Sequence, residues 1–378
     1  MVTKPKRKTA KKAQRRSTRK TGAKKPAAKS IAPGAGPVTL NEARAMTVAK
    51  RPTLAMPKAA APASSPAAVG AERKRLQKAR ANEFDRRIRE YKSTMEIMKK
   101  RGARAPTAKT QSKSKGKDKG EGGAAATKST GFQPLQIFAE GDSWFDYPVP
   151  FFGGGIIPRM EELLGVPILN LAKAGDEVRY MLGVEERKLL IKHLTQGCPA
   201  GGPWDALLFS GGGNDIVDNP MALWVNDWNP TIPPQAHINQ PRFSAALTLV
   251  KAGYEDLIAL RDGLSPGTHL FFHSYDFAIP DGRGICFLGP WLKPTFDLRK
   301  FPNRAVAQAV VTAMLQQFAA MLTDLATHPG VTFVNTQGTL APTPNSWHNE
   351  LHPSSAGFDK ITEKIRAQIA VQFPTRVA

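Results

Sequence analysis

The chain has 378 residues, two cysteines and a formal net charge of +23. This length permits a large hydrophobic core, and two cysteines are too few for a disulfide-stabilised scaffold. No run of about 18 apolar residues predicts a membrane span, and no apolar segment of a signal peptide follows the basic start, so we expect a cytoplasmic protein with Cys198 and Cys286 as free thiols.

The positive charge is concentrated in the first third of the chain. Residues 1–130 hold 36 of the 54 Lys and Arg residues but only 8 of the 31 Asp and Glu residues, a net charge of +28, which leaves −5 for the remainder. Residues 1–70 are rich in Lys, Arg, Ala and Pro and lack the apolar surface that offsets ordering entropy. We therefore expect a disordered basic arm that binds nucleic acid or another anionic surface without specificity, or a solvated tail with no dedicated partner.

Residues 71–101 have the pattern of an amphipathic helix. Apolar side chains recur there at helical spacing, namely Leu76, Phe84, Ile88, Tyr91, Met95 and Met98. Three interpretations remain open: the helix pairs with itself, docks on the following domain, or lies against an acidic partner. Residues 102–130 return to the composition of a linker.

From residue 131 to 378 the sequence predicts one α/β domain. Short apolar runs predict strands at 135–139, 167–171, 206–210, 268–274 and 331–335. Helical patterns lie between and after them, at 157–164, 176–195, 241–262, 303–327 and 355–372. Such alternation predicts a three-layer α/β/α fold with a mainly parallel sheet of about five strands.

Polar clusters follow the predicted strands, where ligands bind in an open parallel sheet. Four clusters are conspicuous: Gly-Asp-Ser-Trp at 141–144, Asn-Leu-Ala-Lys-Ala-Gly at 170–175, Gly-Gly-Gly-Asn-Asp at 211–215 and Trp-His-Asn-Glu-Leu-His-Pro at 347–353. A serine hydroxyl becomes a useful nucleophile when an imidazole takes its proton. Fixed donors near the resulting oxyanion each lower the barrier by about 3 kcal/mol.

These clusters resemble, in the same order, the signature blocks of the SGNH/GDSL hydrolases, over about residues 130–375. The resemblance implies a flavodoxin-like fold and an esterase that needs neither metal nor cofactor. It implies Ser143 as nucleophile, His352 as base, and an oxyanion hole built from the N–H groups of Ser143 and Gly175 and the amide of Asn214. Trp144 stands where many members have Leu, which affects packing more than chemistry.

The third member of the triad departs from the family pattern. Members usually have Asp three residues before the histidine, and here that residue is Asn349. An amide oxygen can fix the tautomer of His352 but adds no charge to stabilise an imidazolium. Three alternatives stay open: Asn349 orients the histidine, the neighbouring Glu350 does so instead, or no side chain does.

The substrate is less well defined than the chemistry. Trp144, Asp215, Trp224 and Trp291 are candidates for substrate contacts, and three ester classes stay open: a small acyl ester, an acetylated glycan or a lipid ester. The alternative function is a weak or inactive SGNH-like domain that binds glycans or acyl groups, tethered by the basic arm to nucleic acid or an anionic surface.

Overall fold

The computed structural model describes residues 36–47, 66–103, 133–147, 154–285 and 288–377. Most of the predicted basic arm, most of the predicted linker and Cys286 lie outside these ranges. Cys198 is a buried free thiol, as expected for one of the two cysteines.

The core of the domain is a five-stranded sheet in which every strand pair is parallel. Its strands are β1 (Ile137–Gly141), β2 (Ile168–Asn170), β3 (Ala206–Ser210), β4 (His269–His273) and β5 (Val331–Val334), in the order β2-β1-β3-β4-β5. The central strands β1 and β3 are buried along their whole length, because helices cover both faces. The predicted fold class and all five predicted strands are confirmed.

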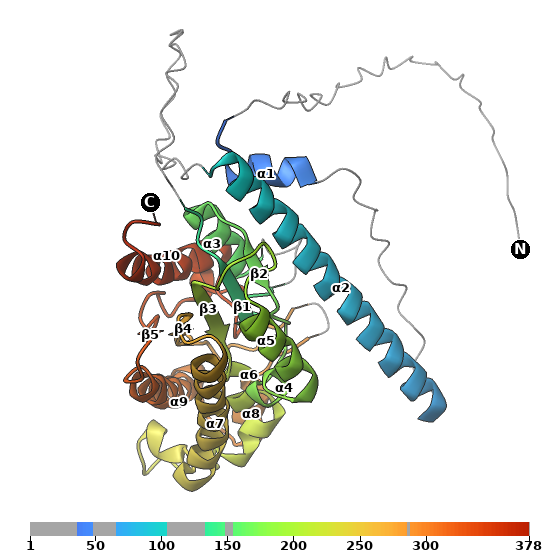
Figure 1. Cartoon of the computed structure of the whole chain (residues 1–378). Helices are drawn as coiled ribbons and strands as arrows, with labels where there is room; N and C mark the ends of the chain where they lie inside the picture. The colour runs from blue at the N-terminus through green and yellow to red at the C-terminus, as the bar shows by residue number, and fades with distance from the viewer. Residues whose placement is uncertain (1–35, 48–65, 104–132, 148–153, 286–287, 378) are drawn as a thin grey trace, which may run out of the picture. The chain divides into compact units, whose positions relative to one another are not determined.

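Helices flank this sheet (Figure 1). They are α3 (Ile156–Leu164), α4 (Val178–Met181), α5 (Val184–Gln196), α6 (Gly213–Ile216), α7 (Gln240–Leu264), α8 (Lys293–Leu298), α9 (Arg304–Leu325) and α10 (Ser355–Gln372). Short 3₁₀ turns are η1 (Asn219–Leu223), η2 (Pro234–His237) and η3 (Pro344–Ser346). Right-handed crossovers place α3 and its neighbour α10 on one face and α5, α7 and α9 on the other.

Helix α9 bears on the expectation that the chain has no membrane span. Among the described helices it has the length and hydropathy of a membrane span, although the sequence analysis found no such run. Ten of its residues are buried in the domain core. A core helix passes the same test, so this composition is weak evidence for a membrane span.

The predicted helix 176–195 is divided into α4 and α5. The break falls at Leu182 and Gly183, and Gly183 has the extended backbone of a helix N-cap. A glycine inside a helix carries a large entropic cost, which favours a break at this position.

Helix α1 (Leu40–Thr47) lies inside the segment that we expected to be disordered. Thr39 and Glu42 form a capping box: the Thr39 N–H donates to the Glu42 carboxylate at 2.8 Å, and the Glu42 N–H donates to Thr39 Oγ1 at 3.3 Å. Leu40 and Ala43 are buried against Met98 of α2. The expectation was wrong for this stretch, because a capped turn with two apolar residues finds a partner helix.

Helix α2 spans Pro66–Arg101 and docks on the domain, one of the three alternatives for this helix. Tyr91 and Met95 belong to the main hydrophobic core, and the Tyr91 ring lies 5.6 Å from that of Trp204. The predicted apolar stripe does not continue to Leu76, which is 55% exposed. The helix therefore packs through its second half.

Candidate active site

The turn after β1 carries Ser143 at the carboxyl edge of the sheet. Gly141 is required at the end of the strand, because a Cβ there would lie 2.6 Å from the Ser210 carbonyl oxygen. The buried Asp142 carboxylate accepts hydrogen bonds from the Trp144 N–H, the Ser210 hydroxyl and the Tyr275 hydroxyl. These bonds fix the turn that presents Ser143.

Burial raises the pKa of Asp142 to about 6, against the opposing effect of its hydrogen-bond donors. Asp142 makes no hydrogen bond to a histidine among the described residues. Its role in the fold is therefore to hold the turn.

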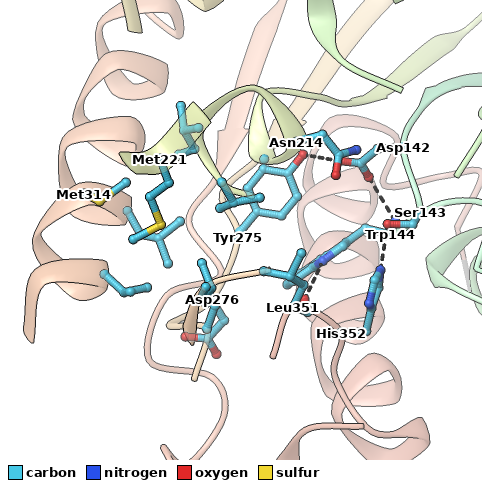
Figure 2. A pocket seen from close by; sticks show the side chains of 17 residues that line it. Asp142, Ser143, Trp144, Asn214, Met221, Tyr275, Asp276, Met314, Leu351 and His352 are labelled. Carbon is cyan, nitrogen blue, oxygen red and sulfur yellow. Dashed lines mark hydrogen bonds between the residues drawn. The ribbon is translucent and has the colours of Figure 1, made fainter. Parts of the chain in front are cut away.

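His352 reaches Ser143 from the loop that precedes α10 (Figure 2). Its Nε2 lies 2.7 Å from Ser143 Oγ, and its Nδ1 lies 3.0 Å from Asn349 Oδ1. The sequence-predicted nucleophile and base are thus in direct contact, which is consistent with a catalytic pair. The residue is only 6% exposed.

The hydrogen bonds around Asn349 fix the tautomer of His352. Asn349 Oδ1 accepts the backbone N–H groups of Leu351 at 3.0 Å and His352 at 2.9 Å, so this atom is the amide oxygen. An oxygen facing Nδ1 requires that Nδ1 carries the hydrogen. The lone pair of Nε2 is then free to accept the Ser143 hydroxyl hydrogen, which is the tautomer that general-base catalysis requires.

Tyr147 supports the same arrangement from the side. Its hydroxyl accepts a hydrogen bond from Asn349 Nδ2 at 3.2 Å and forms another with His348 Nδ1 at 2.7 Å. Its ring stacks on the His352 ring at 4.3 Å between centroids. Local sequence does not predict this role of Tyr147, because the stacked ring of His352 lies 205 positions away in the chain.

Burial, with a smaller contribution from His348, lowers the pKa of His352 to about 3. The ring is therefore neutral at neutral pH and available as a base. Asn349 contributes no charge that would raise this pKa.

The side chain of Glu350 does not face His352 but binds backbone N–H groups of two other loops. Its two carboxylate oxygens accept four backbone N–H groups, from Gly282, Trp291, Leu292 and Lys293, at 2.6–3.0 Å. Burial raises its pKa despite these donors. The carboxylate ties two loops together, and it is Asn349 that faces Nδ1 of His352.

The three expected oxyanion donors lie on three neighbouring strand ends. The N–H groups of Ser143 and Gly175 donate to no other residue that the structure describes. Gly175 has a φ of +83°, a conformation that strains any other L-residue. Asn214 on α6 donates one amide hydrogen to the Asp176 carbonyl at 2.8 Å, which leaves its second hydrogen for a substrate.

A mainly apolar pocket opens beside this pair. Its space, counting the part open to solvent, is about 540 Å³, and Ser143, Asn214 and His352 are among its lining residues. Figure 2 shows Met221 and Met314 at the end away from Ser143. The remaining lining is Asp142, Trp144, Gly213, Ile216, Val217, Tyr275, Asp276, Ala278, Leu292, Val311, Leu315 and Leu351.

Of the four predicted substrate contacts, two lie near the catalytic pair and two lie at another pocket. Trp144 lines the apolar pocket, and its indole N–H donates to the Leu351 carbonyl at 3.1 Å. The Trp291 ring lies 6.0 Å from that of His352. Asp215 and Trp224 line a different surface pocket, and Asp215 accepts the Val178 N–H at 2.9 Å.

Comparisons with known proteins agree with this geometry. A family model described as "GDSL-like Lipase/Acylhydrolase family" matches residues 141–360. A comparison with curated proteins gave no match.

Several solved structures are similar. The lipase Lip_vut3 from a goat rumen metagenome is 18% identical, with a TM-score of 0.41, and the match covers 62% of this chain and 96% of that one. An extracellular lipase from Streptomyces rimosus is 14% identical, with a TM-score of 0.39 and coverage of 62% and 99%. A carbohydrate esterase family 3 protein from Talaromyces cellulolyticus is 12% identical, with a TM-score of 0.36 and coverage of 65% and 100%. At these identities the likeness does not extend to the substrate.

Proposed function

Because the chain belongs to the GDSL-like lipase/acylhydrolase family, we propose that it is a serine esterase that cleaves carboxylic esters with an apolar acyl group through an acyl-Ser143 intermediate. The observation that supports this most is the 2.7 Å contact between Ser143 Oγ and His352 Nε2 at the mouth of the apolar pocket. The nucleophile, the base and a site for the acyl chain occur together.

In the first half-reaction, Ser143 Oγ attacks the ester carbonyl carbon while His352 Nε2 takes the hydroxyl proton. The carbonyl oxygen becomes an oxyanion, which accepts hydrogen bonds from the N–H groups of Ser143 and Gly175 and from Asn214 Nδ2. His352 then gives its proton to the leaving alcohol oxygen as the bond from carbon to that oxygen breaks. The products are an alcohol and acyl-Ser143.

In the second half-reaction, His352 takes a proton from water, and the water oxygen attacks the acyl carbon. The same donors stabilise the second oxyanion, and His352 returns the proton to Ser143 Oγ as the carboxylic acid leaves. In both halves Asn349 Oδ1 holds the Nδ1 hydrogen, so that Nε2 alone exchanges protons.

The pocket supports an acyl group that is apolar, as in a small acyl ester or a lipid ester. Apart from Asp276, its walls beyond the catalytic end are mainly Met, Leu, Ile, Val, Ala and aromatic side chains, and burying each CH₂ of an acyl chain contributes about 0.8 kcal/mol. An acetylated glycan remains compatible if its acetyl group alone enters the pocket.

The test is hydrolysis of p-nitrophenyl acetate, butyrate and octanoate by the full chain and by Ser143→Ala. The exposed Ser244 on α7 provides the matched control, Ser244→Ala. We expect Ser143→Ala to lose all but the residual rate and Ser244→Ala to retain the wild-type rate. Equal rates in wild type and Ser143→Ala would refute the proposal and favour the alternative, a domain that binds acyl groups or glycans without turnover.

We further propose that the basic N-terminal region binds nucleic acid or another anionic surface through charge. Among the described residues, Lys74 and Lys78 are exposed on the first half of α2. Binding of duplex DNA, measured by fluorescence anisotropy, should weaken steeply with salt and disappear when residues 1–65 are removed. Salt-insensitive binding would contradict this proposal. The cytoplasmic location stays a proposal that fractionation of expressing cells would test.

A further inference from the structure

Arg87 of α2 uses its whole guanidinium group to join segments far apart in the sequence. Nε donates to Glu83 at 3.0 Å, on the same helix. Nη1 donates to the carbonyl oxygens of Asn170 and Ala172, both at 3.1 Å. Nη2 donates to the two carboxylate oxygens of Asp146 at 3.1 and 3.2 Å. The five N–H hydrogens of the side chain thus have five acceptors.

The two segments that Arg87 joins carry the nucleophile and an oxyanion donor. Asp146 belongs to the turn of Ser143, and its N–H donates to the Asp142 carbonyl at 3.0 Å. Ala172 lies in the loop that leads from β2 to Gly175. One guanidinium therefore braces the Ser143 turn against the loop of Gly175, in addition to the direct bond from the Lys173 N–H to the Gly141 carbonyl at 2.8 Å.

Arg80, two turns earlier on α2, holds the same loop on the far side of Gly175. It forms ion pairs with Asp176 at 3.1 Å and with Glu186 of α5 at 2.5 Å. Asp176 directly follows Gly175, and its carbonyl oxygen is the acceptor of the Asn214 amide. Helix α2 thus contacts this loop on both sides of Gly175, through Arg87 at Ala172 and through Arg80 at Asp176.

Gly175 needs such external support. It is exposed, it has no side chain, and a Cβ placed on it would meet no atom within 4 Å. Since Gly175 has no side chain to pack, the direction of its N–H depends on the residues on either side that are held in place. A displacement of about 1 Å in a positioning element can lower a rate about 100-fold.

We propose that Arg87 is a positioning residue for catalysis, which holds the Ser143 turn and the loop of Gly175 in place, and that Arg80 assists it. The catalytic rate then depends on α2. This inference rests on the proposed function. Helix α2 precedes the family-matched range, residues 141–360, so the dependence belongs to this chain's own N-terminal extension.

The experiment compares Arg87→Ala and Arg87→Lys with Arg86→Ala in the full chain, on p-nitrophenyl acetate. Arg86 is the matched control, because its described ion-pair partners, Glu83 and Glu90, lie on α2 itself. We expect Arg87→Ala to lower kcat at least about tenfold with KM within about twofold, and Arg86→Ala to stay within about twofold in both. Lysine has three donors and no planar fork, so Arg87→Lys should rescue kcat only in part.

Two further measurements separate positioning from a loss of stability. A boronic acid forms a tetrahedral anion on the serine, and its Ki should rise in Arg87→Ala by a factor similar to the loss of kcat. Hydrogen exchange of the amides of residues 171–176 should become faster in Arg87→Ala and not in Arg86→Ala. Thermal unfolding confirms that the assays use folded protein, and if Arg87→Ala does not fold, Arg87→Lys and Asp146→Asn supply the same readouts.

The proposal is overturned if Arg87→Ala keeps kcat within about twofold of wild type, or if kcat falls while the boronic acid Ki and the exchange of residues 171–176 stay unchanged. Failure of the proposed function has a different result: the wild type would then show no activity that Ser143→Ala removes. In that case hydrogen exchange still tests whether Arg87 holds the loop of residues 171–176 in place. Unchanged exchange in Arg87→Ala would overturn that part of the proposal.

Discussion

Asn349 Oδ1 lies 3.0 Å from His352 Nδ1 and is at the same time the acceptor of two backbone N–H groups. In a triad whose aspartate has been replaced by asparagine, the amide can present its NH₂ group and favour the wrong tautomer. The backbone donors prevent that here, because an NH₂ group in this position would face two N–H hydrogens. Asn349 therefore orients His352 without charging it.

This arrangement predicts an unusual pH profile for the wild type. A base must be neutral to accept the serine proton, and the lowered pKa of His352, about 3, keeps it neutral well into acid. We expect His352 to produce no acid limb in kcat/KM for p-nitrophenyl acetate between about pH 5 and about pH 8, whereas an ordinary histidine would lose activity below about pH 6.5. The Asp142 carboxyl, with a pKa of about 6, titrates in this range, so the profile is also measured in Asp142→Asn, where position 142 does not titrate. An acid limb near about pH 6.5 that persists in Asp142→Asn would contradict the assignment.

Asn349→Asp should restore the charge that the site lacks. A carboxylate beside Nδ1 stabilises the imidazolium, so the pKa of His352 rises and the acid limb moves toward neutral pH. Because the transition state carries that imidazolium, kcat on the plateau should rise by at least about tenfold. A pH–rate series on both proteins measures both effects, with unchanged thermal unfolding as the control. A slower variant with an unmoved limb would count against Asn349 as the orienter.

The two candidate orienters can be separated by a pair of substitutions. Asn349→Ala removes the acceptor of Nδ1, and we expect kcat to fall about 100-fold or more. Glu350→Gln places an amide NH₂ group against backbone N–H donors, so the free energy of unfolding should fall by about 1–3 kcal/mol. The kcat of the folded protein should stay within about fivefold of wild type. Denaturant unfolding and initial rates at low temperature give both numbers. The reverse pattern would identify Glu350 as the orienter.

The apolar pocket predicts a dependence on acyl chain length. Met314→Trp adds bulk at the end away from Ser143, so kcat/KM for p-nitrophenyl octanoate should fall at least about tenfold while that for the acetate stays within about threefold. Leu223→Trp, in the separate surface pocket, is the matched control and should change neither. Equal losses on both esters would place the acyl chain elsewhere.

Much of this architecture could be predicted from the sequence, because its elements are locally encoded. The five strands are short, mainly apolar runs, and the polar clusters that follow strands include Ser143, Asn214 and His352. The start of the short helix α1 is also encoded locally, by the capping-box residues Thr39 and Glu42. The low-complexity composition around them nevertheless favoured a prediction of disorder.

The rest depends on contacts between distant residues. That Asn349 rather than Glu350 faces His352 follows from which backbone N–H groups surround each side chain. The five bonds of Arg87 reach as far as Ala172, and nothing in a basic helix distinguishes Arg87 from Arg86 before the chain is folded. Asp215, which follows a strand, and Trp224, an aromatic residue in a long connection, were candidates for substrate contacts, yet both line another pocket.

The most direct test of the central claim is detection of the acyl-enzyme. Full-length protein mixed rapidly with excess p-nitrophenyl butyrate and quenched in acid should show a burst of p-nitrophenol and a mass increase of one butyryl group, located on the peptide that contains Ser143. Ser143→Ala should show neither. Turnover by the wild type with no acyl group on Ser143, or with the group on another residue, would contradict the account.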